Sequence, residues 1–406
     1  MDNPDDRALA PPPWLFGRQG MALLTVATLA AVVLSAPDVA LLAGTLLVAG
    51  ALARGWAAVA LRRVHYGRQL LTYRAFCGDT VPLETSLGNR KPLPLPWIEA
   101  WERLPRALVP DVAATQPSVL SPGMVWLRQG AALWPYQRAR WRHRLECRRR
   151  GAYIVGPAQV RTGDPFSLFE RELTILQEQE LLVYPRVVPL RRLALPLRHP
   201  SLDTVGLRSL VTDPTRTAAL RDYRPGDPQR LIHWPSTAHR GGLQVRVLEP
   251  ATSLHVALVL DIRSWRLYGD EPFEMAVSAL ASIAVYLQEN GWPVALLANT
   301  EQPLVLAPGS DAAHLERVLD ALARVEAAFT WPLVPWALGH LPRAATTILA
   351  TSDLAGDLPE TVVRLAATGR RPTLLLGGTR AMPQLPADIV RLLPGQDLAA
   401  LLEGAL

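Results

Sequence analysis

The stretch LHVALVLDI, residues 254–262, decides the fold of the C-terminal part of this 406-residue chain. It is a continuous apolar run that ends in Asp261, which is typical of a strand buried on both faces of a parallel sheet. Strand patterns then follow at 293–298, 346–351 and 372–376, and helix patterns at 274–289, 311–328 and 360–368. This alternation predicts an α/β domain with a doubly wound parallel sheet over 251–406.

Two acidic residues are predicted to lie at the carboxyl ends of these strands. Asp261 follows the first strand, and Asp353 follows the strand at 346–351. Ligands of doubly wound sheets bind at this edge. We therefore expect Asp261 and Asp353 to lie close together at the mouth of the sheet.

Two apolar runs near the N-terminus predict a transmembrane helical hairpin over 20–61. Residues 20–36 carry no charge, and residues 39–61 contain Arg54 as their one charged residue. Each run is close to the roughly 20 residues that cross a bilayer as a helix, and Pro37-Asp38 offers a polar place to reverse direction. A cleaved signal peptide is the alternative, but apolar sequence continues far past any cleavage site.

The positions of the arginines orient this hairpin. The short turn has none, whereas arginines stand on both sides of the hairpin, at Arg7, Arg18, Arg62, Arg63, Arg68 and Arg74. The positive-inside rule predicts a cytoplasmic tail at 1–19 and a cytoplasmic location for the bulk of the chain, with the hairpin in the inner membrane. The two cysteines, Cys77 and Cys147, are expected to be free thiols in that reducing compartment.

Residues 62–200 are predicted to form a β-sandwich of the Ig-like kind. The clearest strand is 138–148, where arginine stands at every second position from Arg138 to Arg144 and mostly apolar residues stand between. This period of two predicts one basic and one apolar face. We interpret the basic face as the solvated outside of a sandwich strand, with a nucleic-acid-binding ribbon as the alternative.

Residues 201–250 link the sandwich to the α/β domain and contain RDYRPGDPQRLIHWPSTAHRGG at 221–242. Pro225-Gly226-Asp227 is a turn signal. Arg230 is predicted to pair with Asp227 in a fork, and Trp234 to serve as an apolar anchor. Two interpretations remain open: a buried Arg-Asp-Trp clasp that pins a long loop, and a surface that recognises a partner.

An enzyme site in this segment is the alternative function. Ser236 with His233 or His239 forms a loose trio without a nucleophile elbow or an orienting acid, which leaves a hydrolase as the less favoured interpretation. The sequence contains no Gly-rich phosphate loop with lysine, no His-Glu-x-x-His and no Cys-x-x-Cys. We therefore expect no cofactor and no catalytic activity.

Four stretches in order resemble the bacterial family called domain of unknown function 58. They are RGAYIVGPAQVRTGDPFSLF (150–169), YPR (184–186), the segment 221–242 and LVLD (258–261). The family signature Tyr-x-Pro-Gly-Asp-x-x-Arg-x-Ile-x-Trp is matched here at Tyr223, Pro225, Gly226, Asp227, Arg230, Ile232 and Trp234. His233 departs from the pattern, since the family usually has Asp before the tryptophan.

This resemblance implies a membrane hairpin joined to a β-sandwich and a von Willebrand factor A-like domain, encoded beside MoxR-type AAA+ ATPases. The expected signature and partner-binding residues are Tyr223, Arg224, Pro225, Gly226, Asp227, Arg230, His233, Trp234 and Arg240. The function that follows is a membrane-anchored interaction scaffold whose partner is a protein, a MoxR-type ATPase, in chaperone-like assembly. The basic net charge of +6 is assigned to the membrane surface, and no nucleic acid is expected.

A-like domains often hold a divalent cation through Asp-x-Ser-x-Ser after the first strand. The corresponding residues here are Asp261, Arg263 and Trp265, with Ser264 between the last two. Replacing two oxygen ligands, one of them by a permanent cation, disfavours a bound dication. We predict a degenerate, metal-free site in which Arg263 bridges Asp261 and Asp353.

Overall fold

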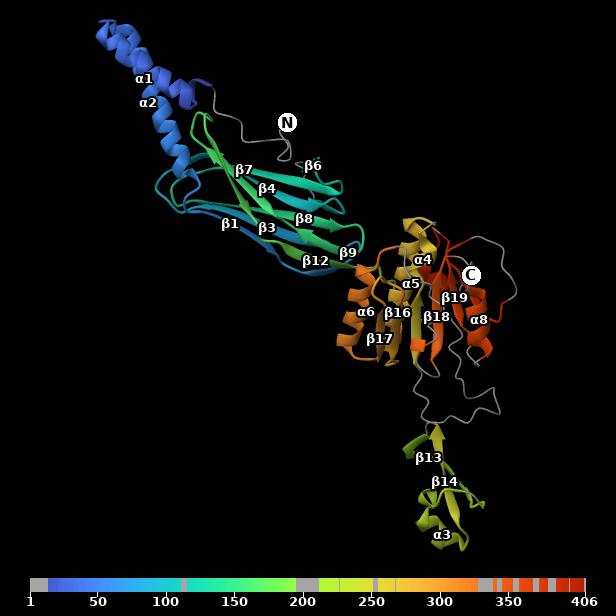
Figure 1. Cartoon of the computed structure of the whole chain (residues 1–406). Helices are drawn as coiled ribbons and strands as arrows, with labels where there is room; N and C mark the ends of the chain where they lie inside the picture. Colours follow the sequence, from blue (N-terminus) through green and yellow to red (C-terminus); the bar gives the residue numbers. More distant parts are fainter. Residues whose placement is uncertain are drawn as a thin grey trace. The chain divides into compact units, whose positions relative to one another are not determined.

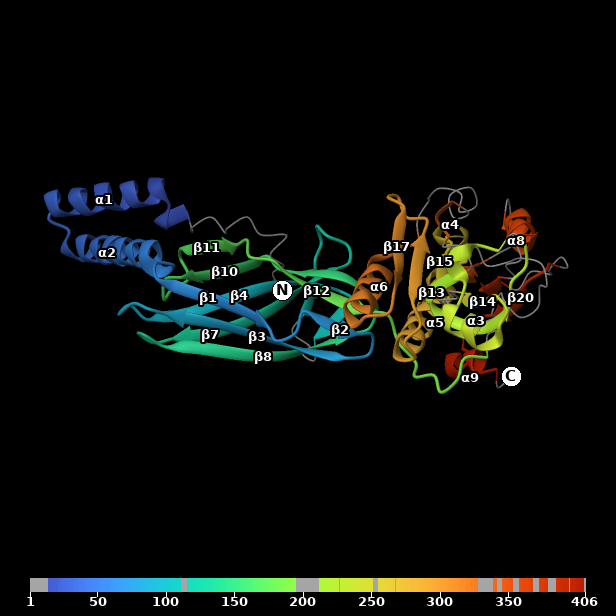
Figure 2. The same ribbon diagram turned by 90° about the horizontal axis from the view of Figure 1, so that it is seen from below.

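The computed structural model describes residues 14–110, 115–194, 212–225, 227–250, 255–266, 268–327, 339–341, 345–352, 358–367, 372–378, 385–393 and 395–404. The chain divides into two compact units, Met1–Arg186 and Val187–Leu406 (Figures 1 and 2). The prediction of a multidomain protein with an apolar N-terminal helix, β-sheets and an α/β region is confirmed at this level.

A helical hairpin opens the first unit. The short helix η1 (Trp14–Phe16) precedes α1 (Arg18–Val33) and α2 (Pro37–Ala60), which lie side by side (Figure 2). Pro37 is the first residue of α2 and the chain reverses over 34–36, because proline suits a first helical turn, where its missing N–H has no partner to lose. The predicted reversal at Pro37-Asp38 was therefore placed slightly too late.

Of the helices that the structure describes, α2 alone is long and apolar enough to cross a membrane. It has 24 residues, whereas α1 is apolar but has 16. Gly50 of α2 allows close packing with η1 and α1, since a Cβ there would lie 2.7 Å from Cδ1 of Phe16 and 3.0 Å from Sδ of Met21. The prediction of a membrane helix is thus confirmed in part.

Three sheets follow α2 in the first unit. Their strands are β1 (Val64–Leu70), β2 (Arg74–Phe76), β3 (Thr80–Asn89), β4 (Leu95–Pro105), β5 (Leu108–Pro110), β6 (Thr115–Pro117), β7 (Met124–Leu133), β8 (Arg138–Cys147), β9 (Gly151–Val155), β10 (Ala158–Gly163), β11 (Glu170–Ile175) and β12 (Gln179–Tyr184). The sheet orders are β1-β3-β8-β5, β11-β10-β4-β7-β6 and β2-β12-β9. The predicted β-structure is confirmed.

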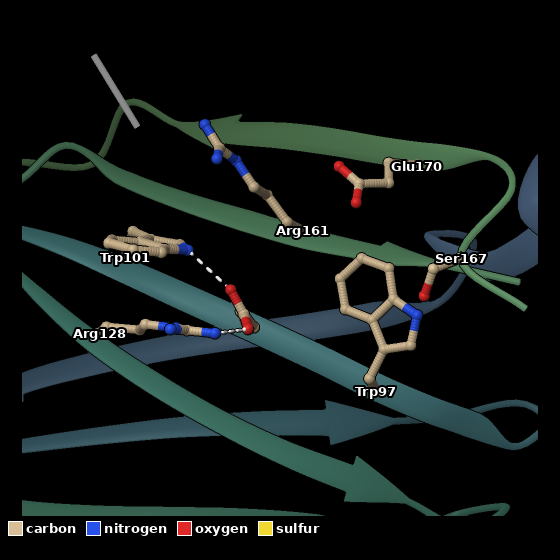
Figure 3. A pocket seen from close by; sticks show the side chains of 7 residues that line it. Trp97, Trp101, Arg128, Arg161, Ser167 and Glu170 are labelled. Atoms are coloured by element: carbon tan, nitrogen blue, oxygen red, sulfur yellow. Dashed lines mark hydrogen bonds and ion pairs between the residues drawn. The ribbon is translucent and has the colours of Figure 1, made fainter. Parts of the chain in front are cut away.

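The alternation in β8 matches its sequence closely. Arg138, Arg140, Arg142 and Arg144 are exposed, whereas His143, Leu145 and Cys147 are buried. The apolar face joins a core that includes Leu83, Leu104 and Leu127 from facing strands. On the other face of the five-stranded sheet, β4 carries Trp97, which is half-buried, and Trp101, which is buried beneath Arg128 and Arg161 (Figure 3).

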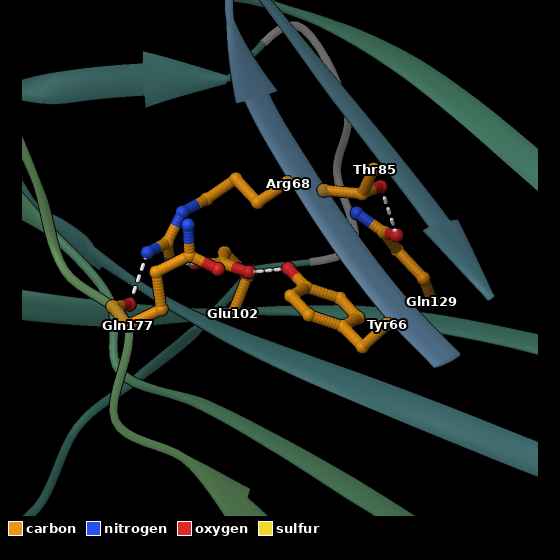
Figure 4. Close-up of polar contacts among 6 residues, drawn as sticks. All are labelled: Tyr66, Arg68, Thr85, Glu102, Gln129 and Gln177. Atoms are coloured by element: carbon orange, nitrogen blue, oxygen red, sulfur yellow. Dashed lines mark hydrogen bonds and ion pairs between the residues drawn. The ribbon is translucent and has the colours of Figure 1, made fainter. Parts of the chain in front are cut away.

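The inside of this unit also holds a buried polar network (Figure 4). Arg68 of β1 forms an ion pair with Glu102 of β4, and both side chains are 1% exposed. Tyr66 donates its hydroxyl hydrogen to Glu102, and Arg68 donates to the carbonyl of Gln177. Burial raises the pKa of Glu102 well above its usual range and lowers that of Arg68. The network ties β1 and β4 to the chain before β12.

The end of α2 is fixed to these sheets. Ala60 packs among Leu87, Ile98 and Val160 in a second apolar cluster. Lys91, the one lysine in the sequence, donates from Nζ to the carbonyl of Ala60 at 2.6 Å and so caps the helix C-terminus, where a cation is favoured. The apolar helix therefore continues directly into the β-structure.

The second unit contains a two-stranded sheet of β13 (Thr212–Asp222) and β14 (Gln244–Pro250), which run antiparallel. Between them lie η2 (Gln229–Leu231) and α3 (Trp234–Arg240). The signature segment is thus carried between the two strands of a β-hairpin (Figure 1).

The remainder of the second unit is an α/β sheet in the order β17-β16-β15-β18-β19-β20. Its elements are β15 (Val256–Leu260), α4 (Ile262–Trp265), α5 (Asp270–Glu289), β16 (Val294–Ala298), β17 (Leu304–Gly309), α6 (Ala312–Arg324), β18 (Thr346–Thr351), α8 (Leu358–Ala367), β19 (Thr373–Leu376), β20 (Asp388–Arg391) and α9 (Leu398–Leu402). The sheet is parallel except for β17, which pairs antiparallel with β16. The predicted wholly parallel sheet is corrected in this respect.

Strand β15 lies in the middle of this sheet, between β16 and β18. Each of its five residues is buried, as its continuous apolar sequence predicts. The first α/β strand thus pairs with both the second and the fourth, so the winding direction changes between β15 and β18. This is the topological switch point, beside which ligands of open α/β sheets bind.

Candidate functional site

The signature segment forms an ordered turn and helix. Pro235 stands in the first turn of α3, and the side chain of His233 accepts a hydrogen bond from the backbone N–H of Ser236 as its N-cap. Gly241 ends the helix with φ +68°, a left-handed conformation that glycine adopts without strain. His233 is also anchored through its own N–H, which donates to the carbonyl of Gln244 on β14 at 2.8 Å.

Asp227 holds the turn before α3, but its partner differs from the predicted one. Arg221 of β13 donates to both carboxylate oxygens at 2.7 Å, and the N–H of Arg224 donates to Oδ2 at 2.9 Å. These contacts lower the pKa of Asp227 to about 2. The predicted fork between Arg230 and Asp227 is wrong, because Arg221 forms the fork with this carboxylate instead. Gly226 lies outside the described residues.

Trp234 does not serve as a buried anchor. It is the first residue of α3, and 65% of it is exposed to solvent. Arg224, Arg230 and Arg240 are also exposed, and Tyr223 is half-buried. The buried Arg-Asp-Trp clasp is thus corrected: the ion pair stabilises the turn, and the indole faces solvent.

We call the exposed side chains Arg224, Arg230, Trp234 and Arg240 the signature surface. It combines one large aromatic group with arginines, the residue types that carry most of the binding energy at protein interfaces. The structure leaves this surface uncovered by described residues.

The histidine and serine of the alternative enzyme site do meet. Nδ1 of His233 lies 2.8 Å from Oγ of Ser236 and 3.3 Å from its backbone nitrogen. Both contacts belong to the cap of α3. The Ser236 hydroxyl is therefore positioned by the helix terminus. Among the contacts of these two residues, no acidic side chain orients the imidazole of His233, as a catalytic triad would require.

The residues at the switch point form a connected polar cluster. Asp261, directly after β15, accepts from Nδ2 of Asn299 at 3.0 Å, and the hydroxyl of Thr351 lies 3.2 Å from its Oδ2. Ser264 is 3.1 Å from the same hydroxyl and accepts the N–H of Ser352 at 3.0 Å. The cluster joins the carboxyl ends of β15, β16 and β18.

Burial raises the pKa of Asp261, while its hydrogen bonds act in the opposite direction. Its two carboxylate oxygens face amide and hydroxyl donors, which is the environment of a satisfied structural carboxylate. In the described part of the chain, no group of three or more His, Cys, Asp or Glu side chains is arranged to hold a metal ion.

Trp265 closes the same region. It is fully buried, its ring centroid lies 6.0 Å from that of Phe273, and a Cβ at Gly377 would lie 2.2 Å from its Cζ3. The glycine after β19 thus makes room for the indole. We predicted that the guanidinium of Arg263 lies beside Asp261. Instead Arg263 is exposed, and Asn299 and Thr351 contact the carboxylate. Asp353 lies outside the described residues.

Three important residues were not singled out from sequence: Arg221, Asn299 and Thr351. Asn299 and Thr351 stand at the carboxyl ends of β16 and β18, so the rule that selected Asp261 was sufficient to find them. Arg221 lies on a strand, and its contact with Asp227 depends on how the hairpin closes.

Comparison with known proteins finds a match that contains the signature segment and much of the α/β sheet. A family described as protein of unknown function DUF58 matches residues 219–371. An uncharacterized protein, YeaD of Bacillus subtilis (strain 168), is 25% identical over 323 residues, which cover 78% of this chain and 76% of that protein.

Solved structures resemble parts of the chain at low similarity. The CARDB domain of the PF1109 protein from Pyrococcus furiosus matches 30% of this chain and 91% of its own length, with a TM-score of 0.21 and 9% identity. Proximal thread matrix protein 1 from the mussel byssus matches 37% of this chain and 46% of its own length, with a TM-score of 0.29 and 11% identity.

Proposed function

We propose that this chain, which belongs to the DUF58 family, is a membrane-anchored scaffold that binds a protein partner through the signature surface. The observation that carries the proposal is Trp234, an aromatic side chain 65% exposed on a helix whose ends are both capped. A large apolar group costs free energy when it is left in water, and its burial in a partner recovers that cost. Its rigid mounting lowers the entropic cost of binding.

The finer fold assignments belong to this proposal. We assign the α/β region to the von Willebrand factor A-like class and the first β-structure to the Ig-like sandwiches. The sheet order, with an antiparallel edge strand next to the second strand, is consistent with the first assignment. In such a domain the switch point is a natural recognition edge, and here it is filled by Trp265 and the Asp261 cluster.

The proposed membrane topology has two spans, α1 and α2, in an inner membrane, with the bulk of the chain in the cytoplasm. The flanking arginines and the length and composition of α2 support it. Apolar side chains on the outer faces of both helices, such as Leu29 and Leu41, are exposed and would face lipid.

The proposed partner is a MoxR-type AAA+ ATPase acting in chaperone-like assembly, as the family resemblance implies. The signature surface supplies the arginines and the tryptophan for such an interface. The alternative is a hydrolase that uses His233 and Ser236, whose side chains lie 2.8 Å apart.

Co-purification tests the scaffold directly. The full-length protein in detergent should retain a MoxR-type ATPase encoded by a neighbouring gene, and Trp234→Ala should weaken that binding by about 30-fold, the equivalent of roughly 2 kcal/mol. Trp134→Ala is the matched control, because Trp134 is 71% exposed on the first unit. Equal binding by both variants would exclude the signature surface, and substrate turnover that His233→Ala abolishes would favour the hydrolase.

A further inference from the structure

A groove on the outer face of the five-stranded sheet is not used by the proposed function. Its volume is about 280 Å³, enough for a small polar group (Figure 3). Strands β4, β7, β10 and β11 and the turn after β10 supply its lining, which consists of Trp97, Glu99, Trp101, Arg128, Arg161, Ser167 and Glu170.

The sequence stretch RTGDPFSLF (161–169) builds one wall of this groove. Asp164 is fully buried and accepts the N–H groups of Phe166 and Phe169 at 2.9 and 2.7 Å, which fixes the turn between β10 and β11. Nε1 of Trp97 donates to the carbonyl of Asp164 at 3.2 Å. A Cβ at Gly163 would lie 2.7 Å from Cζ2 of Trp97, so glycine lets the indole lie against β10. The wall is therefore held rigidly before any ligand arrives.

Cations already stack on an indole in this groove. The guanidinium groups of Arg128 and Arg161 lie 5.3 and 5.9 Å from the ring of Trp101. Both are neutralised, since Arg128 pairs with Glu99 and Arg161 pairs with Glu172 at 3.0 Å. Glu99 also accepts from Nε1 of Trp101 at 3.2 Å.

Glu170 is the remaining charged residue of the groove lining. Among the described residues its carboxylate has no ion-pair or hydrogen-bond partner, whereas the other charged groups of the lining are compensated. Figure 3 shows Glu170, Ser167 and Trp97 around the same open space. The groove thus offers one uncompensated negative charge beside an aromatic ring and a hydroxyl.

We propose that this groove binds a small alkylammonium group. The ammonium would lie between the carboxylate of Glu170 and the indole of Trp97, with Ser167 as a hydrogen-bond acceptor. A carboxylate and an indole together select a cation over an anion, because both attract positive charge. An anion at the same place would be repelled by the carboxylate of Glu170, and both arginines of the lining already pair with a glutamate.

The position of the groove points to a phospholipid headgroup as the carrier of the ammonium. The guanidinium of Arg54, in the last two turns of α2, lies 5.9 Å from the ring centroid of Phe169 in the same β10–β11 turn. The turn therefore adjoins the end of the helix that is long and apolar enough to span a membrane. The assignment of the ammonium to a phospholipid rests on the membrane anchor of the proposed function, whereas the proposal of ammonium binding does not.

Calorimetric titration of the full-length protein in detergent tests the chemistry, with ethanolamine hydrochloride as the probe. We expect saturable binding that weakens at least tenfold in Glu170→Gln and in Trp97→Leu and survives in Trp97→Phe, which retains an aromatic face. Glu146→Gln, at an exposed carboxylate on β8, is the matched control. Binding of phosphate in place of the amine, or amine binding unchanged in Glu170→Gln, would overturn the proposal.

Lipid nanodiscs distinguish the two sources of the amine, which are a phospholipid headgroup and a free amine in solution. Co-purifying lipid, measured by mass spectrometry, should be enriched in phosphatidylethanolamine over phosphatidylglycerol around the wild type, and Glu170→Gln should lose that enrichment. Amine binding in the calorimeter without lipid enrichment would assign the site to a free amine. Both readouts are independent of Trp234, so failure of the ATPase interaction leaves this test intact.

Discussion

Replacing Asp261 with alanine distinguishes two roles of its carboxylate, that of a structural hydrogen-bond acceptor and that of a metal ligand. The change removes the acceptor for Nδ2 of Asn299 at 3.0 Å and for the hydroxyl of Thr351 at 3.2 Å, both at a buried position. Thr351 retains Ser264 as an acceptor at 3.1 Å, so the cost falls mainly on the amide of Asn299. Loss of a buried donor's partner costs about 1–3 kcal/mol, and the cavity adds to it.

We therefore expect Asp261→Ala to lower the free energy of unfolding by about 2–3 kcal/mol, or the midpoint temperature by roughly 4–12 °C for a unit of this size. Thermal unfolding of the full-length protein in detergent, with and without millimolar Mg²⁺, is the assay. Glu360→Gln, at a carboxylate 64% exposed on α8, should change stability by less than about 0.5 kcal/mol. The reasoning is refuted if Mg²⁺ stabilises the wild type but not Asp261→Ala.

Four further outcomes are expected. Arg221→Gln should increase amide hydrogen exchange across the signature turn, whereas Arg230→Gln should not, because Arg221 alone of the two pairs with Asp227. The folded pKa of Asp227, about 2, lies below its unfolded value near 4, so its contribution is complete above about pH 4 and is lost as pH falls through 2, which carboxyl NMR shifts would follow. Trp265→Ala should cost about 3–5 kcal/mol in denaturant unfolding, through the cavity it leaves. Glu102→Gln should cost about 3–5 kcal/mol in the first unit, because it removes the charge that compensates buried Arg68; an unchanged midpoint would contradict this.

Patterns that repeat along the chain were predictable from sequence. The arginine alternation of β8 and the continuous apolar run of β15 reappear as an exposed basic face and a fully buried strand. Each residue in such a strand follows the same pattern of burial, so a longer strand gives a stronger periodicity in the sequence. Short elements contain too few residues to show such a pattern. The edge strands β17 and β20 have six and four residues and the helix α9 has five, and the sequence did not predict them.

Contacts between side chains were less predictable than elements. Proximity in sequence favoured Arg230 as the partner of Asp227, but Arg230 lies in η2, whereas Arg221 reaches the turn from β13. Other residues take the place beside Asp261 that we predicted for Arg263, for a similar reason, and Asp353 lies outside the described residues. Asn299 comes to Asp261 from a neighbouring parallel strand 38 residues away, and strand order is set by the sheet as a whole.

The central claim is that the signature surface binds a protein partner, and hydrogen–deuterium exchange on the full-length protein tests it most directly. With a saturating MoxR-type ATPase present, we predict protection of amides in 221–242 that is lost in Trp234→Ala and retained in Trp134→Ala. Protection that leaves 221–242 unchanged and appears elsewhere in the chain would contradict the claim.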